Sequence, residues 1–244
     1  MAYDFSGKRA LVTGAGKGIG RNTAKALLQC GAEVIALSRT QSDLDSLKQE
    51  APGIQIVLAD ISDIKSTVTL IEKLAPIHLL VNNAAVAKLQ PFLEITEEAY
   101  DQLMQINLKA TLFISQAVAK DLVQRGLPGS IVNISSQASL VTLPEHTVYS
   151  TSKAGLDMLS KSMGAELGPK GIRVNTVNPT VVLTAMGRYG WSDPAKAGPM
   201  IARIPVGRFA EEEEISDVIL YLLSDKSAMI NCAVLPVDGG FTAT

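Results

Sequence analysis

A chain of 244 residues with 47% hydrophobic residues can bury a substantial core, and its length suits one large α/β domain. The formal net charge of −2 comes without a basic block or stripe, which excludes the electrostatic surface that nucleic-acid binding requires. The two cysteines, Cys30 and Cys232, lie far apart and form no Cys/His cluster. We therefore expect neither a disulfide framework nor a metal site.

The N-terminal sequence lacks the apolar core of a signal peptide. A strand-like run begins at Arg9, so removal of a leader would cut into the fold. No uninterrupted apolar stretch reaches the roughly 20 residues that a membrane helix needs. We expect a soluble protein of the cytoplasm, and a peripheral membrane or mitochondrial location stays open.

Strand-like and helix-like segments alternate along the chain. The expected strands are residues 10–13, 33–38, 54–59, 78–81, 130–134, 172–177 and 233–237. The expected helices are residues 23–28, 43–48, 66–74, 97–107, 110–124, 148–167 and 215–223. Residues 184–205, rich in Gly, Pro and Met, are expected to form an irregular insertion that covers the substrate. The alternation predicts one Rossmann-type α/β domain, residues 1–244, with a doubly wound parallel sheet of about seven strands and helices on both faces.

A glycine-rich turn, residues 14–20, joins the first expected strand to the first expected helix. Glycines let the backbone approach a diphosphate, and the helix N-terminus supplies N–H donors and a positive dipole end. The spacing Thr-Gly-x-x-x-Gly-x-Gly, from Thr13 to Gly20, differs from the common GxGxxG. A glycine-rich turn without context is often only a tight loop, but the strand–turn–helix context here favours dinucleotide binding.

The end of the second expected strand indicates which dinucleotide binds. An NAD site normally has a carboxylate there for the adenosine ribose, whereas this chain has Ser38 followed by Arg39. A guanidinium suits a 2′-phosphate, and Lys17 in the glycine turn adds a second positive charge. These residues predict NADP(H), although Arg39 could be only a solvated loop residue. Asp43 lies past the strand and is expected to face solvent.

Tyr149 and Lys153 are four residues apart on an expected helix, so their side chains leave the same face. A phenol titrates near pH 10, and a nearby ammonium favours the phenolate and lowers that pKa. Ser136 could hold a carbonyl oxygen beside the phenol. With a hydride from the dinucleotide, this group would move a proton on or off an alcohol. The spacing alone is weak, since it also describes an ordinary exposed helical pair.

Together these features resemble the short-chain dehydrogenase/reductase family over nearly the whole chain. The matching positions are Thr13 to Gly20, Asp60 with Ile61, Asn82-Asn83-Ala84-Ala85, Asn107, Ser136, Tyr149, Lys153, Asn178-Pro179, Thr184 and Asp238-Gly239-Gly240. Ala85 departs from the family's usual glycine, a small change. Each motif is fallible alone, but their order along one chain is specific.

The resemblance implies a role for each matching residue. The catalytic residues would be Asn107, Ser136, Tyr149 and Lys153. Asn107 would connect Lys153 to solvent through water, so that Tyr149 is reprotonated. The cofactor-binding residues would be Gly14, Lys17, Gly18, Ile19, Gly20, Ser38, Arg39, Thr40, Asp60, Ile61, Asn83, Ala84, Ala85, Tyr149, Lys153, Pro179, Val182 and Thr184.

Within the family, the chain is most similar to members that reduce carbonyl compounds with NADPH. This similarity implies reduction of α-dicarbonyls and of L-xylulose, reversibly, to xylitol. The substrate-binding residues would be Ser136, Gln137, Leu143, His146, Tyr149, Thr180 and Trp191. His146 could equally lie in a surface loop, and Trp191 could equally pack within the covering segment.

Alternative functions remain open at this point. A broad carbonyl reductase or a 3-oxoacyl reductase would use the same catalytic residues. A non-catalytic NADP-binding scaffold is remote, because such proteins usually lose the serine, tyrosine or lysine. The apolar faces of residues 110–124 and 153–167 exceed what one sheet face needs. The family pairs such helices between subunits, which implies a homotetramer.

Overall fold

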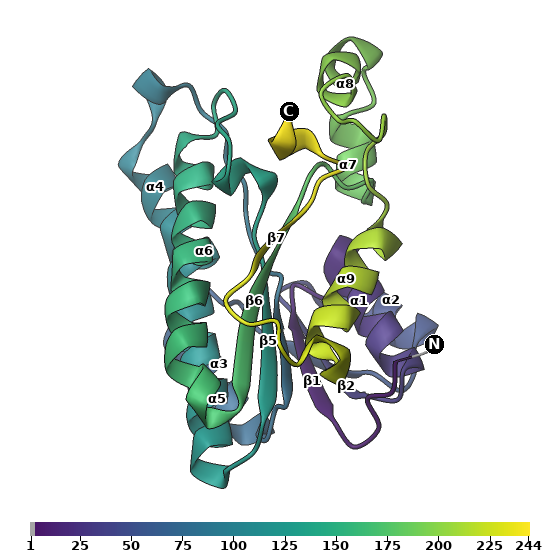
Figure 1. The fold of residues 1–244 in the computed structure, drawn as a ribbon, viewed down its shortest axis with the longest axis vertical. Coiled ribbons are helices and arrows are strands. Elements are labelled where there is room, and N and C mark those ends of the chain that lie inside the picture. The colour runs from purple at the N-terminus through teal and green to yellow at the C-terminus, as the bar shows by residue number, and fades with distance from the viewer. Residues whose placement is uncertain (1–2) are drawn as a thin grey trace.

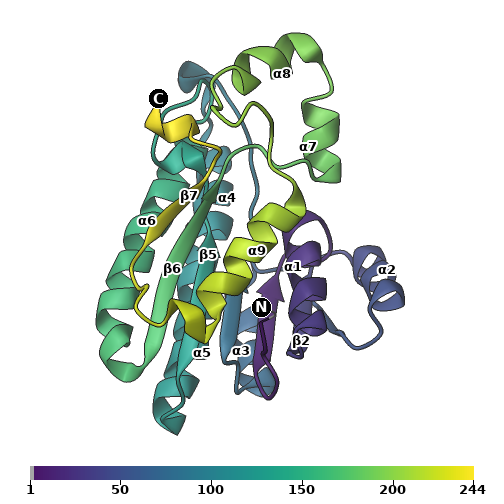
Figure 2. The same cartoon turned by 45° about the vertical axis from the view of Figure 1, so that its right-hand side comes forward.

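The computed structural model describes residues 3–244, the side chain of Met186 excepted, as a parallel sheet covered by helices on both faces (Figures 1 and 2). The strands are β1 (Arg9–Thr13), β2 (Glu33–Ser38), β3 (Gln55–Leu58), β4 (Leu79–Asn82), β5 (Gly129–Ile134), β6 (Ile172–Pro179) and β7 (Val234–Val237). Their order is β3-β2-β1-β4-β5-β6-β7, and each neighbouring pair is parallel. This arrangement confirms the predicted doubly wound α/β class.

Helices on both faces explain why the central strands β1, β2 and β4 are mostly apolar and buried. The helices are α1 (Gly18–Gln29), α2 (Gln41–Glu50), α3 (Ile64–Leu74), α4 (Glu97–Met104), α5 (Thr111–Arg125), α6 (Thr147–Leu167), α7 (Ala185–Gly190), α8 (Pro194–Ile201) and α9 (Glu212–Leu223). In β1, Ala10 and Val12 pack with α1, α2 and α9, whereas Leu11 packs with α3 and α5 on the opposite face. Successive strand residues point to opposite faces, so each strand contributes to two cores.

The chain reverses its direction of travel across the sheet at β1. It adds β2 and β3 on one side of β1 and then returns to place β4 on the other side. The carboxyl ends of β1 and β4 therefore form a topological switch point, where open α/β sheets bind ligands. The glycine turn follows β1, and Asn83 follows β4, so both lie at this point.

The helices expected at residues 97–107 and 110–124 are not separate. A π-helical turn, Gln105–Ala110, joins α4 directly to α5. Asn107 lies in this turn and exchanges two hydrogen bonds with the backbone of Val86. Its Oδ1 accepts from the Val86 N–H at 2.9 Å, and its Nδ2 donates to the Val86 carbonyl at 2.9 Å. Such turns contain one extra residue and are frequent at functional sites.

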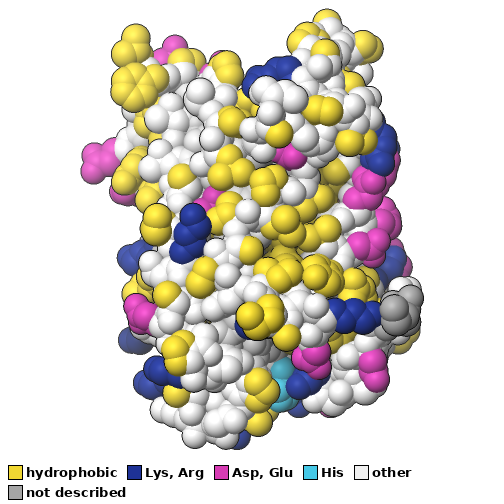
Figure 3. All heavy atoms as spheres, in the orientation of Figure 1, with side chains coloured by type: hydrophobic (Ala, Val, Ile, Leu, Met, Phe, Trp, Pro, Cys, Tyr) yellow, Lys and Arg dark blue, Asp and Glu magenta, His cyan; other side chains and the backbone are white. Residues whose placement is uncertain are grey.

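The covering segment is also more regular than its composition predicts, since residues 184–205 contain α7 and α8. Thr184 caps α7 by accepting a hydrogen bond from the Gly187 N–H at 3.0 Å, and Asp193 accepts from the Ala195 N–H at 2.9 Å. Each cap satisfies a backbone N–H group in the first turn, which stabilises even a short helix. The surface is hollowed between these helices and the opposite rim of the molecule (Figure 3).

Candidate active site

The glycine turn holds its backbone close to the segment after β4. Gly14 has φ +64°, and a Cβ there would lie 2.8 Å from Ala84 Cα. A Cβ on Gly20 would lie 2.5 Å from the Gly14 carbonyl oxygen. Both positions therefore exclude side chains, one by conformation and both by space.

Thr13 and Asn83 fasten the glycine turn to the end of β4. The Thr13 hydroxyl oxygen accepts from the backbone N–H groups of Asn83 at 3.0 Å and Ala84 at 3.1 Å. In return, Asn83 Nδ2 donates to the carbonyl oxygens of Thr13 and Gly14, at 3.0 and 3.1 Å. The two walls of the switch point are thus held together by hydrogen bonds in both directions.

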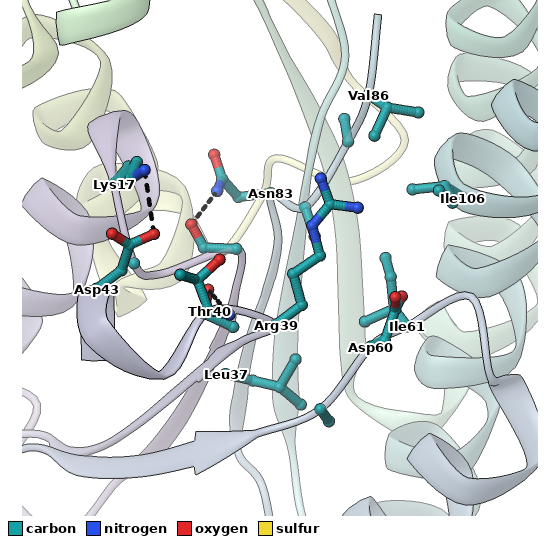
Figure 4. Close-up of a pocket in the computed structure, with 16 residues that line it drawn as sticks. Lys17, Leu37, Arg39, Thr40, Asp43, Asp60, Ile61, Asn83, Val86 and Ile106 are labelled. Carbon is teal, nitrogen blue, oxygen red and sulfur yellow. Dashed lines mark hydrogen bonds and ion pairs between the residues drawn. The ribbon is translucent and has the colours of Figure 1, made fainter. Parts of the chain in front are cut away.

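A pocket opens beside this turn (Figure 4). It is lined by predicted cofactor residues from four strand ends: Gly14, Lys17, Ser38, Arg39, Thr40, Asp60, Ile61, Asn83, Ala84 and Ala85. Val86 and Ile106 also line the pocket. The sequence analysis missed these two residues, because an apolar residue in a loop or helix has no binding signal of its own. This pocket at the carboxyl ends of the strands could hold the adenosine half of a dinucleotide.

Two positively charged side chains border the pocket, and only one of them has an ion-pair partner among the described residues. The Arg39 side chain is exposed and extends from the end of β2 into the pocket (Figure 4). Within residues 3–244 its guanidinium has no hydrogen-bond or ion-pair partner. Lys17 instead pairs with Asp43, with 3.3 Å between Nζ and Oδ2. Asp43 was expected to face solvent, and that prediction is wrong: its side chain is only 19% exposed and lines the pocket.

The position of Asp43 has a simple cause. Helix α2 begins at Gln41, directly after β2, so its first turn lies against the glycine turn. A Cβ on Gly16 would lie 2.9 Å from Asp43 Cβ. The 2′-phosphate predicted for this pocket would therefore meet one unpaired guanidinium and one ammonium shared with a carboxylate.

The segment from Pro179 to Thr184 connects β6 to α7 and approaches the glycine turn at Gly18. A Cβ on Gly18 would lie 2.9 Å from Thr184 Cγ2, so the two residues are in contact across the cleft. Val182 forms a bridge with Ala210 and is buried. Ile19 packs against the core on the α1 face. These residues frame the turn, and Gly18 depends on having no side chain.

Ser136 and Tyr149 meet at the carboxyl end of β5. The Ser136 hydroxyl oxygen accepts a hydrogen bond from the Ala138 N–H at 3.1 Å, which leaves its own hydrogen free to donate. Tyr149 is half-buried near the start of α6. Burial raises the pKa of Tyr149, and a hydrogen bond with Ser136 acts in the opposite direction. The phenol is therefore protonated at neutral pH and suits a proton donor.

Lys153 lies on α6, one helical turn after Tyr149, and is 3% exposed. Its Nζ donates to the carbonyl oxygen of Ile134 at 2.8 Å and lies 5.7 Å from the centroid of the Tyr149 ring. Burial lowers the pKa of Lys153 to about 8, and the negative charge of Asp157 opposes that decrease. The expected lowering of the Tyr149 pKa by Lys153 is not seen, because desolvation of the phenol is the dominant effect.

Asn107 is connected to α6 by a hydrogen bond to Ser152. Its Nδ2 donates to Ser152 Oγ at 3.1 Å, and Ser152 Oγ donates to the Tyr149 carbonyl oxygen at 2.7 Å. All three groups are near the π-helical turn, so Asn107 connects that turn, the Val86 backbone and the first turns of α6. Ser152 was not predicted, and its small polar side chain on a buried helix face was the only sequence signal.

The predicted substrate residues divide into two sets. The Oε1 of Gln137 and the Oγ1 of Thr180 are buried, and neither has a hydrogen-bond partner in the described part of the chain. The His146 ring lies edge-on to the Tyr149 ring, with centroids 6.1 Å apart. Leu143 and Trp191 pack instead against an apolar cluster that includes Met200 of α8. Trp191 lies edge-on to Phe209, with ring centroids 5.4 Å apart.

The described residues form neither a metal site nor a membrane-spanning helix. Residues 3–244 contain no group of three His, Cys, Asp or Glu side chains placed to hold a metal ion. No helix within the same range is both long enough and apolar enough to cross a bilayer.

Comparison with known proteins finds matches that cover nearly the whole chain. Residues 14–242 match the family described as "Enoyl-(Acyl carrier protein) reductase". The chain is 57% identical over 244 residues to L-xylulose reductase of Mus musculus, and the match covers the whole of both chains. It is 57% identical over 237 residues to D-erythrulose reductase of Gallus gallus, covering 97% of this chain and 96% of that protein.

The fold is also similar to solved structures. A gluconate 5-dehydrogenase from Burkholderia cenocepacia J2315, in complex with NADP and tartrate, superposes with a TM-score of 0.91. The two are 29% identical, and the match covers 99% of this chain and 97% of the other. The similarity therefore extends over nearly the whole chain.

Proposed function

The chain belongs to the short-chain dehydrogenase/reductase family, and we propose that it is an NADPH-dependent carbonyl reductase acting on L-xylulose and α-dicarbonyls. Full-length identity of 57% to an L-xylulose reductase supports the substrate, and D-erythrulose reductase at the same identity supports a hydroxylated ketone. L-xylulose would be reduced to xylitol, reversibly. We also propose that residues 1–244 form a single catalytic domain.

The cofactor would be NADP(H). Arg39 and Lys17 would bind the 2′-phosphate, Asp60 and Ile61 the adenine, and the glycine turn the diphosphate. Pro179, Val182 and Thr184 would hold the nicotinamide end. When bound, this cofactor supplies the hydride that the carbonyl carbon receives.

The protein side of the reaction is proton transfer. Ser136 donates a hydrogen bond to the carbonyl oxygen, and Tyr149 gives that oxygen its proton as negative charge develops there. The Lys153 ammonium then stabilises the phenolate that Tyr149 becomes, since an opposite charge counts most in a desolvated site. Asn107 holds a water-linked path for reprotonation. One hydride and one proton convert the carbonyl to an alcohol.

The buried oxygens of Gln137 and Thr180, which have no hydrogen-bond partner within residues 3–244, are the groups that select the substrate. A buried polar atom without a partner is costly, so a ligand that bonds it gains affinity. Gln137 directly follows Ser136, and Thr180 follows the strand end whose Asn178 bonds the Ser136 carbonyl. The hydroxyl groups of a ketose beside the reacting carbonyl would satisfy both atoms, and the second carbonyl of a diketone would accept a hydrogen bond from the Thr180 hydroxyl. An acyl chain or an aromatic ring would leave them unpaired, which disfavours a 3-oxoacyl or broad carbonyl reductase.

An NADPH-consumption assay on matched substrates tests this proposal. We expect L-xylulose and diacetyl to be reduced with higher kcat/KM than a 3-oxoacyl thioester or a pyridyl ketone. Gln137→Leu should remove most of the preference for L-xylulose while retaining reduction of the pyridyl ketone. A preference for the thioester would favour the 3-oxoacyl alternative. No turnover with any carbonyl would favour a non-catalytic NADP-binding protein.

Assembly is a separate part of the proposal. A groove between α5 and α6 exposes apolar side chains, among them Leu112, Val123, Leu159 and Met163. Hydrophobic side chains also gather over β7 and α9 (Figure 3). Two such faces suit a homotetramer, in which each subunit uses both. A monomer in sedimentation at micromolar concentration would contradict this. We further propose a cytoplasmic role in xylose and carbohydrate metabolism.

A further inference from the structure

Asp157 is a buried carboxylate that the reaction as described does not use. It lies on α6, four residues after Lys153, and is 7% exposed. Both of its oxygens accept from Asn178 Nδ2, at 3.2 and 3.0 Å. A buried charge is costly unless its partners compensate it, so a carboxylate at this place needs an explanation.

Asn178 links Asp157 to Ser136, because its side-chain amide contacts both residues. It lies near the end of β6, and its Nδ2 also lies 3.3 Å from the carbonyl oxygen of Ser136 and 2.9 Å from Ser139 Oγ. Its Oδ1 accepts from Thr176 Oγ1 at 2.9 Å, which fixes the orientation of the amide. The amide nitrogen therefore joins the carboxylate on α6 to the turn that presents the Ser136 hydroxyl.

Asp157 also faces the second buried charge of the site. Lys153 and Asp157 lie one helical turn apart on the same face of α6, and the two side chains form no direct ion pair within residues 3–244. Coulomb interactions fall slowly with distance where water is excluded, so the carboxylate acts on the ammonium across the protein interior. Its charge favours the protonated form of Lys153.

We propose that Asp157 is a positioning residue for both halves of the proton-transfer site. Through Asn178 it fixes the turn of Ser136, and by its charge it keeps Lys153 an ammonium in a buried position. This inference rests on the proposed carbonyl reduction, because it assigns Asp157 a part in that same site.

Other titratable groups around Lys153 are few. Tyr149 lies above it on α6, with His146 at the start of the helix. The short helical turn Gln137–Ser139 contains none. On β6, Arg173 is engaged by the carbonyl oxygens of Leu222 and Ser224. Charged or phenolic residues on α6 and on other elements packed against it are exposed, at Glu97, Glu98, Tyr100, Asp101, Lys109, Lys161, Glu166 and Lys170.

The test is the pH dependence of kcat/KM for diacetyl reduction with Asp157→Asn. In the wild type, we expect activity to fall as Lys153 loses its proton near its pKa of about 8. Without the carboxylate, that fall should begin at a lower pH, so that kcat/KM drops about two- to fivefold more at pH 8 than at pH 6. The Kd of NADPH should not change, because Asp157 does not line the cofactor pocket.

Ser139→Ala is the matched control. It removes one uncharged partner of Asn178, so we expect a lower kcat with the pH profile unmoved. Asp157→Glu keeps the charge and should keep the wild-type profile, with a lower kcat because Asn178 is displaced. If Asp157→Asn does not fold, Asp157→Glu decides, since a moved profile in that variant overturns the proposal.

The outcomes separate this inference from the proposed function. An unmoved profile in folded Asp157→Asn, with an active wild type, overturns the role of Asp157 alone. A wild type that reduces no carbonyl compound overturns the proposed function itself.

Discussion

The Lys17 ammonium and the Asp43 carboxylate pair at 3.3 Å beside the glycine turn, where the 2′-phosphate of NADPH is proposed to bind. Asp43 competes with that phosphate for Lys17 and repels it. Asp43→Asn should therefore lower the Kd of NADPH by about two- to fivefold, the range of a partly exposed ion pair. Titration of NADPH fluorescence measures this change. Asp45→Asn removes the same charge from an exposed position on α2 and should leave the Kd unchanged.

Arg39 should account for most of the preference for the phosphorylated cofactor. Replacing it with Leu removes charge-assisted hydrogen bonds, which predicts a rise of about 10- to 100-fold in the Kd of NADPH. NADH lacks the 2′-phosphate and serves as the internal control, with an expected change of less than about threefold. Equal loss for both cofactors would mean that Arg39 supports the pocket wall and does not read the phosphate.

Tyr149→Phe removes the proton donor and leaves the ring in place. We expect kcat for L-xylulose reduction to fall by a factor of about 10³, within the range for loss of general acid catalysis. The NADPH Kd should stay within about twofold, because Tyr149 does not line the adenosine pocket. Substantial remaining turnover in this variant would sink the assignment of Tyr149.

The reaction should lose activity at high pH. Burial lowers the pKa of Lys153 to about 8, and reduction needs its ammonium to stabilise the Tyr149 phenolate. A group that must be protonated supports the reaction below its pKa and fails above it. We therefore expect kcat/KM for reduction to be level below about pH 7.5 and to fall up to tenfold per pH unit above about 8.5. A level profile up to pH 10 would contradict the requirement for the ammonium.

The sheet was predictable because its central strands β1, β2 and β4 are buried and mostly apolar, and a polar or glycine-rich segment follows each of them. The glycine turn, Arg39 and the Tyr149–Lys153 spacing likewise showed their chemistry in the sequence. Their roles in binding and catalysis stay predictions. The placement of Asp43 was not predictable, because it depends on how closely α2 follows β2. The Tyr149 pKa depends on desolvation, which residue spacing does not reveal.

Two helical features were also hidden in the sequence. Residues 184–205 contain glycine and proline, which favour irregular structure, yet caps at Thr184 and Asp193 start α7 and α8. Residues 105–110 contain neither glycine nor proline, so nothing local indicates a widened turn. Its cause is tertiary, since Asn107 is held by the backbone of Val86.

That widened turn adds one residue without changing the rotational phase of the helix that follows it. Each helical residue advances the side chains by about 100°, so one extra residue lets Asn107 point at Val86 while Ile114 and Val118 of α5 still point at the sheet. Deleting one residue between 105 and 110 would restore a regular helix and leave α5 in the same phase, because the widened turn absorbs the extra residue. Asn107 would then no longer point at Val86, and both of their hydrogen bonds would be lost. A deletion in this turn would therefore keep the core contacts of α5 and remove the connection between Asn107 and α6.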